Sequence, residues 1–119
     1  MERQMFPVYD RASEILNALP GGILLTAAAN GRTNTMTIGW GTLGMEWGIP
    51  IFTAFVRTGR FTRELLDANP EFTINVPVGA FDRKILGFCG TKSGRDVDKF
   101  QELGLTAVPG LEVSVPAIA

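Results

Sequence analysis

Apolar residues at helical spacing predict four short helices in this chain. The predicted helices cover residues 9–19, 60–68, 80–89 and 96–103. In the first, the apolar face consists of Ala12, Ile15, Leu16 and Leu19. Pro20-Gly21-Gly22 and Asn69-Pro70 break the pattern after the first two helices. Gly90 and Gly104 are expected to end the other two, because glycine readily closes a helix.

Continuous or alternating apolar residues predict about five strands. The run over 23–29 is short enough for a buried strand, and Asn30-Gly31 after it predicts a hairpin turn. Residues 71–78 alternate, with Phe72, Ile74 and Val76 on one face. The other strands are expected over 34–45, as one strand or a pair, over 51–56 and over 111–115. Because strands and helices do not alternate regularly, we expect a small, mainly antiparallel β-barrel with short surface helices.

The composition is that of one globular domain over residues 1–119. Apolar residues make up 45% of the chain, and the formal net charge is −1. A charge so close to zero gives no strong field to attract nucleic acid, so no such partner is expected. The first residues lack the apolar run of a signal peptide, and no apolar stretch approaches the ~20 residues of a membrane span. No membrane association is therefore expected.

The single cysteine and the absence of histidine limit the catalytic and metal-binding chemistry that the side chains can supply. Cys89 is the single cysteine, which excludes an intrachain disulfide and favours a reducing compartment, so we expect a cytoplasmic protein. The chain has no histidine, which excludes Ser–His and Cys–His nucleophile pairs and most zinc sites. We therefore predict no catalytic side chain and no metal site, and redox chemistry would require a bound cofactor.

Residues 89–100 place glycine, hydroxyl and cationic side chains ahead of a predicted helix. Such a loop can aim backbone N–H groups and cations at one anion. The alternative is a helix cap, with Ser93 and Asp96 as a capping box. A second cationic turn, Arg57-Thr58-Gly59-Arg60, precedes the helix over 60–68. Two such turns in a chain of this size favour a phosphate ligand, although both arginines would also suit solvent.

Three glycines, Gly39, Gly41 and Gly44, punctuate the segment 34–45. Glycine within a strand marks a bend or a place where a ligand approaches the backbone. Both interpretations stay open here, and Trp40 between them fits either the core or the face of a flat ligand.

Four segments, taken in order, resemble the flavin reductase-like family, which has an FMN-binding split-barrel fold, and within it the flavoredoxin branch. The matching segments are residues 34–41, 57–62, 72–77 and 89–100. The resemblance implies a mainly β split barrel, a homodimer, and FMN bound without a covalent bond near the subunit interface. It also implies that reducing equivalents pass through the flavin, supplied by NAD(P)H or by a redox protein.

The resemblance also implies which residues hold the cofactor. The residues expected beside the isoalloxazine ring and ribityl chain are Asn34, Met36, Thr37, Ile38, Gly39 and Trp40. Those expected to make polar and phosphate contacts are Arg57, Thr58, Arg60, Asn75, Thr91, Lys92, Ser93 and Arg95. Lys92, helped by Thr91 and Ser93, is the predicted phosphate contact. The alternative for Asn75 is a bridge between strands.

Members of this family usually continue well beyond the segment 113–118, so the barrel is expected to be incomplete in this chain.

Three functions follow from these observations. The first is an FMN-dependent flavin reductase-like oxidoreductase. The second is a non-catalytic electron carrier like flavoredoxin, and the third is an assembly module without bound flavin.

Overall fold

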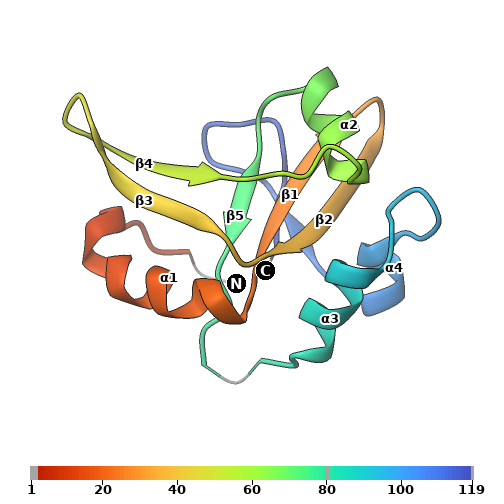
Figure 1. The fold of residues 1–119 in the computed structure, drawn as a ribbon, viewed down its shortest axis with the longest axis horizontal. Helices are drawn as coiled ribbons and strands as arrows, with labels where there is room; N and C mark the ends of the chain where they lie inside the picture. The colour runs from red at the N-terminus through yellow and green to blue at the C-terminus, as the bar shows by residue number, and fades with distance from the viewer. Residues whose placement is uncertain (1–2, 80, 119) are drawn as a thin grey trace.

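The computed structural model describes residues 3–79 and 81–118, and its centre is a three-stranded antiparallel sheet. The strand order is β2-β1-β5, which leaves β2 at one edge (Figure 1). The three strands are β1 (Ile23–Ala29), β2 (Arg32–Ile38) and β5 (Thr73–Asn75). Asn30 and Gly31 join the first two with positive φ angles of 54° and 77°, so the predicted hairpin turn is confirmed.

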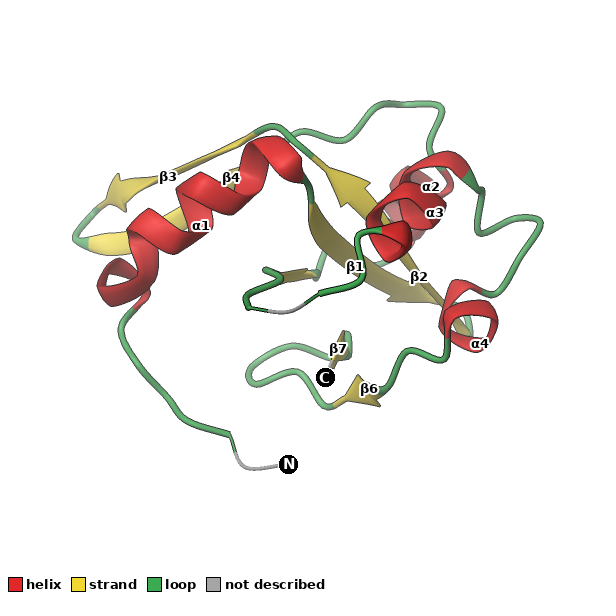
Figure 2. Cartoon of the chain, turned by 90° about the horizontal axis from the view of Figure 1, so that it is seen from below, coloured by secondary structure: helices red, strands yellow, loops and turns green. Residues whose placement is uncertain are grey.

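A second, two-stranded sheet pairs β3 (Gly41–Glu46) with β4 (Ile49–Ala54). The segment 34–45 therefore forms parts of two strands, which separate at Gly39-Trp40. Along β4 the side chains alternate, so Phe52 and Ala54 pack on the core while Ile49 and Ile51 face outward. Figure 2 shows α1 (Ala12–Ala18) running beside this hairpin, away from α3 and α4.

The predicted strand over 111–115 is wrong. These residues form bends, and the short strands near the C-terminus are β6 (Ala107–Val108) and β7 (Ala117–Ile118). This segment is held by hydrogen bonds to side chains of β5 and of the residues just before it, and not by the backbone hydrogen bonds of a strand pair. Those bonds run from Thr73 Oγ1 to Pro116 O at 2.8 Å, from Ile118 N to Asn75 Oδ1 at 2.9 Å, and from Ser114 Oγ to Glu71 Oε1 at 2.6 Å.

The first two helices lie where the sequence pattern predicts them, but their bounds and buried faces differ in part from the prediction. The 3₁₀ turns η1 (Val8–Arg11) and η2 (Leu19–Gly21) flank α1. Leu16, predicted on the apolar face of this helix, is exposed, whereas Leu19 is buried. The second helix, α2 (Phe61–Ala68), begins one residue later than predicted, and its pair Phe61 and Leu65 is buried as expected.

The other two helices begin later than predicted. α3 (Lys84–Thr91) runs through Gly90, so that glycine does not end it. α4 (Lys99–Leu103) begins at Lys99, where the Asp98 side chain accepts the N–H of Gln101 at 3.2 Å. The capping box of Ser93 and Asp96 is therefore wrong, because a separate turn holds these residues before the helix. Gly104 ends α4 with a φ of 64°, as predicted.

The central sheet buries apolar side chains on both faces. On one face, Ile23, Leu25 and Met36 pack with Leu19 and Ile38. On the other, Leu24 packs with Leu86 and Cys89 of α3. Helices and loops therefore approach β2 from both sides of the sheet, and they meet at its open edge.

The described strands form one three-stranded and two two-stranded sheets that do not close into a barrel, as expected for an incomplete barrel. None of the described helices has the length and apolar character needed to cross a membrane.

Candidate functional site

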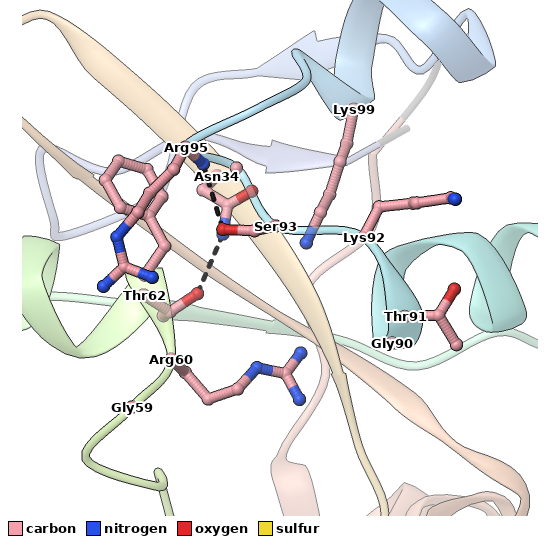
Figure 3. Close-up of a pocket in the computed structure, with 12 residues that line it drawn as sticks. Asn34, Gly59, Arg60, Thr62, Gly90, Thr91, Lys92, Ser93, Arg95 and Lys99 are labelled. Carbon is pink, nitrogen blue, oxygen red and sulfur yellow. Dashed lines mark hydrogen bonds between the residues drawn. The ribbon is translucent and has the colours of Figure 1, made fainter.

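A cleft of about 210 Å³ lies at the free edge of β2, and we call it the β2-edge cleft. The turn before α2 and the loop after α3, which are far apart in sequence, form its two sides (Figure 3). The residues lining it are Asn34, Gly59, Arg60, Phe61, Thr62, Gly90, Thr91, Lys92, Ser93, Gly94, Arg95 and Lys99. Both cationic turns singled out in the sequence thus contribute to one site.

Asn34 lines this cleft and carries a buried acceptor that has no partner among the described residues. The residue is 3% exposed, and its Nδ2 donates to Thr62 Oγ1 at 2.9 Å. Its Oδ1 is buried and has no hydrogen-bond partner among the described residues. A buried polar atom without a partner costs about 1–3 kcal/mol, and a donor would reach Oδ1 only if the loop at Gly94 moved, since Gly94 packs against this oxygen.

Lys99 is the most buried cation of the cleft. Its side chain is 2% exposed, and its Nζ donates to Thr35 O at 2.8 Å and to Cys89 O at 3.0 Å. An ammonium group has three N–H donors, so one remains for the cleft. Burial lowers the pKa of Lys99 to about 8, opposed by the Cys89 thiol and assisted by the Arg60 guanidinium. Nothing in the sequence distinguished Lys99 from an ordinary surface lysine.

The other cations of the cleft differ in how freely they can bind. Arg60 is half-buried at the start of α2, and Figure 3 shows its guanidinium extending into the space below Ser93 and the Lys99 ammonium. Lys92 is exposed, and its ammonium points away from that space. Arg95 forms an ion pair with Glu64, so its charge is partly compensated.

The hydroxyl groups beside these cations also differ in whether their protons are free to bind a ligand. The Thr91 Oγ1 donates to Gly87 O at 2.8 Å within α3, which commits its proton. The Ser93 Oγ accepts the Arg95 N–H at 3.2 Å and keeps its own proton for another acceptor. Thr62, which the sequence did not single out, supports Asn34 from the first turn of α2.

Several predicted flavin contacts along β2 lie outside the cleft. Met36 and Ile38 are 2% and 6% exposed and belong to the core. Thr37 Oγ1 donates to Leu86 O at 2.6 Å and so links β2 to α3. Gly39 and Trp40 are exposed at the corner between β2 and β3, so in this chain Trp40 is not a core residue.

Asn75, Arg57 and Thr58 also lie away from the cleft. The Asn75 side chain bridges strands, because its Nδ2 donates to Thr26 Oγ1 at 3.3 Å and its Oδ1 accepts the Ile118 N–H. Arg57 and Thr58 are exposed in the turn that precedes the cleft. Of the two arginines of this turn, only Arg60 reaches the cleft.

A family profile described as "Flavin reductase like domain" matches residues 16–119. This chain belongs to the flavin reductase-like domain family. The Escherichia coli (strain K12) protein YddH is 32% identical over 109 residues, which cover 90% of this chain and 56% of YddH. The chain therefore spans about half the length of that relative.

Two solved structures resemble this flavin reductase-like domain. One is an FMN-binding domain of a flavin reductase-like enzyme from Shewanella baltica OS155, with a TM-score of 0.74 and 22% identity over 90% of this chain and 56% of that chain. The other is flavoredoxin of Desulfovibrio vulgaris (Miyazaki F), with a TM-score of 0.73 and 28% identity over 82% of this chain and 52% of that chain. Both have the fold described above.

In this flavin reductase-like domain, Gly94 packs directly against the side chain of Asn34 at one side of the cleft. A Cβ added at Gly94 would overlap the Asn34 amide and come within 2.7 Å of Phe61 Cδ2. By contrast, a Cβ added at Gly87 in α3 would meet nothing within 4 Å. The two glycines are therefore a matched pair for substitution.

We expect Gly94→Ala to destabilise the fold by about 1–3 kcal/mol, the usual cost of overpacking. Gly87→Ala should stabilise it by about 0.5–1 kcal/mol, because alanine is the better helix former. Urea denaturation of both variants measures the difference. A neutral Gly94→Ala variant would mean that the loop can move away from Asn34 at no cost.

Proposed function

We propose that this chain binds FMN without a covalent bond and acts as a flavin reductase-like oxidoreductase. The observation that supports this most strongly is the β2-edge cleft, where two cationic turns meet beside the unsatisfied Oδ1 of Asn34. The family membership and the likeness to the FMN-binding domain from Shewanella baltica OS155 agree with it.

The residues of the cleft fit a phosphate monoester. Such a group is close to a dianion at neutral pH and accepts several hydrogen bonds. The donors available to it are the third N–H of Lys99, the Arg60 guanidinium and the Ser93 hydroxyl. Lys92 is a weaker contributor in this arrangement, because an exposed ammonium is screened by solvent.

The ring end of the flavin would lie toward Gly39 and Trp40. Trp40 lies six positions after Asn34 along β2 and the corner that follows it, a distance of at most about 20 Å at ~3.3 Å per residue. Gly39 and Trp40 are both exposed, so the backbone at this corner is accessible to a flat ring. Asn34 would support the ligand site indirectly, through its hydrogen bond to Thr62 at the start of α2, since Gly94 covers its Oδ1.

When bound, FMN supplies the capacity to accept and release hydride or single electrons. The residues named here bind it, orient it and neutralise its phosphate. Steady-state oxidation of NADH or NADPH by purified protein carrying FMN tests the oxidoreductase. If the bound flavin is reduced only by a partner redox protein, that result would favour the electron carrier. The likeness to flavoredoxin supports this second candidate. A protein that does not bind FMN, as judged by its absorption spectrum, would favour the assembly module.

FMN should bind at least about a hundredfold more tightly than riboflavin, which has the same ring and no phosphate. Two hydrogen bonds between charged groups contribute about 3–6 kcal/mol together. We expect Arg60→Gln to weaken FMN about tenfold or more and to leave riboflavin unchanged. Arg63→Gln is the control, since Arg63 pairs with Asp67 on the same helix and does not line the cleft.

Titration of flavin fluorescence gives both affinities for all three proteins. Equal affinity of the unmodified protein for FMN and riboflavin would exclude a phosphate site. An equal loss for both ligands in Arg60→Gln would assign Arg60 to the fold or the ring.

The affinity for FMN should fall as the pH rises above about 8. In the free protein the pKa of Lys99 is lowered to about 8, and a bound anion would raise that pKa again. Binding above pH 8 therefore takes up a proton, and the affinity decreases with pH by at most about tenfold per unit. Riboflavin, which lacks the anion, should show no such slope. Parallel titrations from pH 7 to 9 measure it, and a flat FMN curve would contradict the role of Lys99.

We also propose that the domain forms a homodimer through the outer face of β4. Ile49, Ile51 and Phe55 share that face and are 61%, 37% and 58% exposed. Trp40 and Trp47, 79% and 93% exposed, flank β3 at its two ends. Three aromatic side chains can bury roughly 450–750 Å². That area approaches the ~800 Å² that each partner contributes to a standard interface.

Light scattering at micromolar concentration should give twice the mass of the chain, and Phe55→Glu should give the monomer. Leu111→Glu is the control, because Leu111 is 64% exposed on another segment. A stable monomer of the unmodified protein would contradict the dimer. The remaining length of the relatives would then be the better candidate to cover this face.

A further inference from the structure

A second cleft, of about 280 Å³, lies on the other side of the loop that closes the β2-edge cleft, and we call it the rear cleft. The residues lining it are Gly31, Arg32, Thr33, Gly94, Arg95, Asp96, Val97 and Asp98. Gly94 and Arg95 line both clefts. These two residues therefore form a wall between them.

The wall is braced from both sides. On the side of the rear cleft, Arg32 Nη2 donates to Gly94 O at 2.8 Å. On the other side, Gly94 is packed so closely against Asn34 and Phe61 that it has no room for a Cβ. The loop cannot move toward Asn34 because of this packing, and the Arg32 bond opposes movement of the backbone away from Arg32.

Phe61 links the two arginines that hold the wall. The Arg32 and Arg95 guanidinium carbons lie 4.6 Å and 5.6 Å from the centroid of its ring. Phe61 is 7% exposed, so these cation–π contacts are partly shielded from solvent. Arg95 is also paired with Glu64 on α2. The wall is thus anchored to β2 and to α2 through named side chains.

The two clefts differ in charge. Arg60, Lys92, Arg95 and Lys99 line the β2-edge cleft, with no carboxylate among the described lining residues, although Glu64 partly compensates the charge of Arg95. Arg32 and the shared Arg95 line the rear cleft together with two aspartates, Asp96 and Asp98, so the formal charges there cancel. A dianionic phosphate is therefore attracted to the β2-edge cleft, whereas a second phosphate would gain little electrostatic attraction from the rear cleft.

We propose that the wall of Gly94 and Arg95, braced by Arg32, makes this site select the terminal phosphate of FMN over the pyrophosphate of FAD. This inference rests on the proposed binding of FMN. FAD carries only one negative charge on the phosphate next to its ribityl chain, and its second phosphate would lie against the wall of Gly94 and Arg95. Arg32 is a positioning residue in this arrangement, since it lies outside the β2-edge cleft.

The test compares FMN and FAD affinities for the unmodified protein, Arg32→Gln and Arg63→Gln. The unmodified protein and Arg63→Gln should bind FMN at least about tenfold more tightly than FAD, the effect of one hydrogen bond between charged groups. In Arg32→Gln that ratio should fall to about threefold or less. Equal affinities in the unmodified protein, or an unchanged ratio in Arg32→Gln, would overturn the proposal.

Two further measurements separate the brace from other effects. Arg32→Lys keeps the charge without the planar fork, so it should behave like Arg32→Gln if the brace operates. Behaviour like the unmodified protein would show that only charge matters and would overturn the brace. In the ligand-free protein, hydrogen exchange at Asp96 and Val97, whose N–H groups bond to Ser93 O, should accelerate in Arg32→Gln.

The exchange measurement needs no flavin, so it tests the brace even where the proposed function fails. A protein that binds neither FMN nor FAD would overturn the proposed function and the selectivity together. Unchanged exchange in Arg32→Gln would overturn the brace alone.

Discussion

The buried ammonium of Lys99 is the interaction on which the arrangement of the site depends. Its two hydrogen bonds connect α4 to the edge strand β2 through Thr35 and to α3 through Cys89. A lysine this buried is costly unless its charge is well solvated by dipoles, and the two carbonyl oxygens provide that solvation. Because the bond to Thr35 O also covers one acceptor of the open strand edge, the Lys99 side chain opposes further strand pairing there and sets a positive charge beside the cleft.

Chain segments that are far apart in sequence form the cleft because β2 lies at the edge of its sheet. α2 packs on one face of the sheet, and α3 and α4 pack on the other. The loop from α3 to α4 passes this edge, where Arg32 and Asn34 hold it against Phe61. An interior strand would leave no room for this passage. Polar groups can therefore gather on three elements without interrupting the core.

The strong local signals in the sequence predicted much of the fold. Asn30-Gly31 has one favourable geometry, and the pair Phe61 and Leu65 has one favourable face, so the hairpin and α2 were found. The segment 111–115 alternates like a strand, but Asn75 and Thr73 bind the chain just beyond it, and Glu71 binds within it. Those contacts span 43 residues and are invisible to a local pattern.

The candidate site was predictable only in part for the same reason. The two cationic turns were visible because glycine, hydroxyl and cationic residues cluster in short segments, and the structure brings Arg60, Ser93 and Asn34 together. Lys99 was missed because its burial comes from α3 and β2, and not from its neighbours in sequence. Gly90 was misread as a helix end because a glycine within a helix and one after it look alike without the hydrogen bond from Lys92 N to Phe88 O.

The tight seat of Gly94 has a consequence for the evolution of this domain. The φ of Gly94 is outside the left-handed region, unlike that of Gly104, so only space keeps a side chain from this position. Space can be restored elsewhere, because the neighbours in question are the side chains of Asn34 and Phe61. Replacement of Gly94 in a relative should therefore accompany a smaller residue at one of these two positions. Positions 34, 61 and 94 should vary together, whereas position 104 should remain glycine or asparagine independently of them.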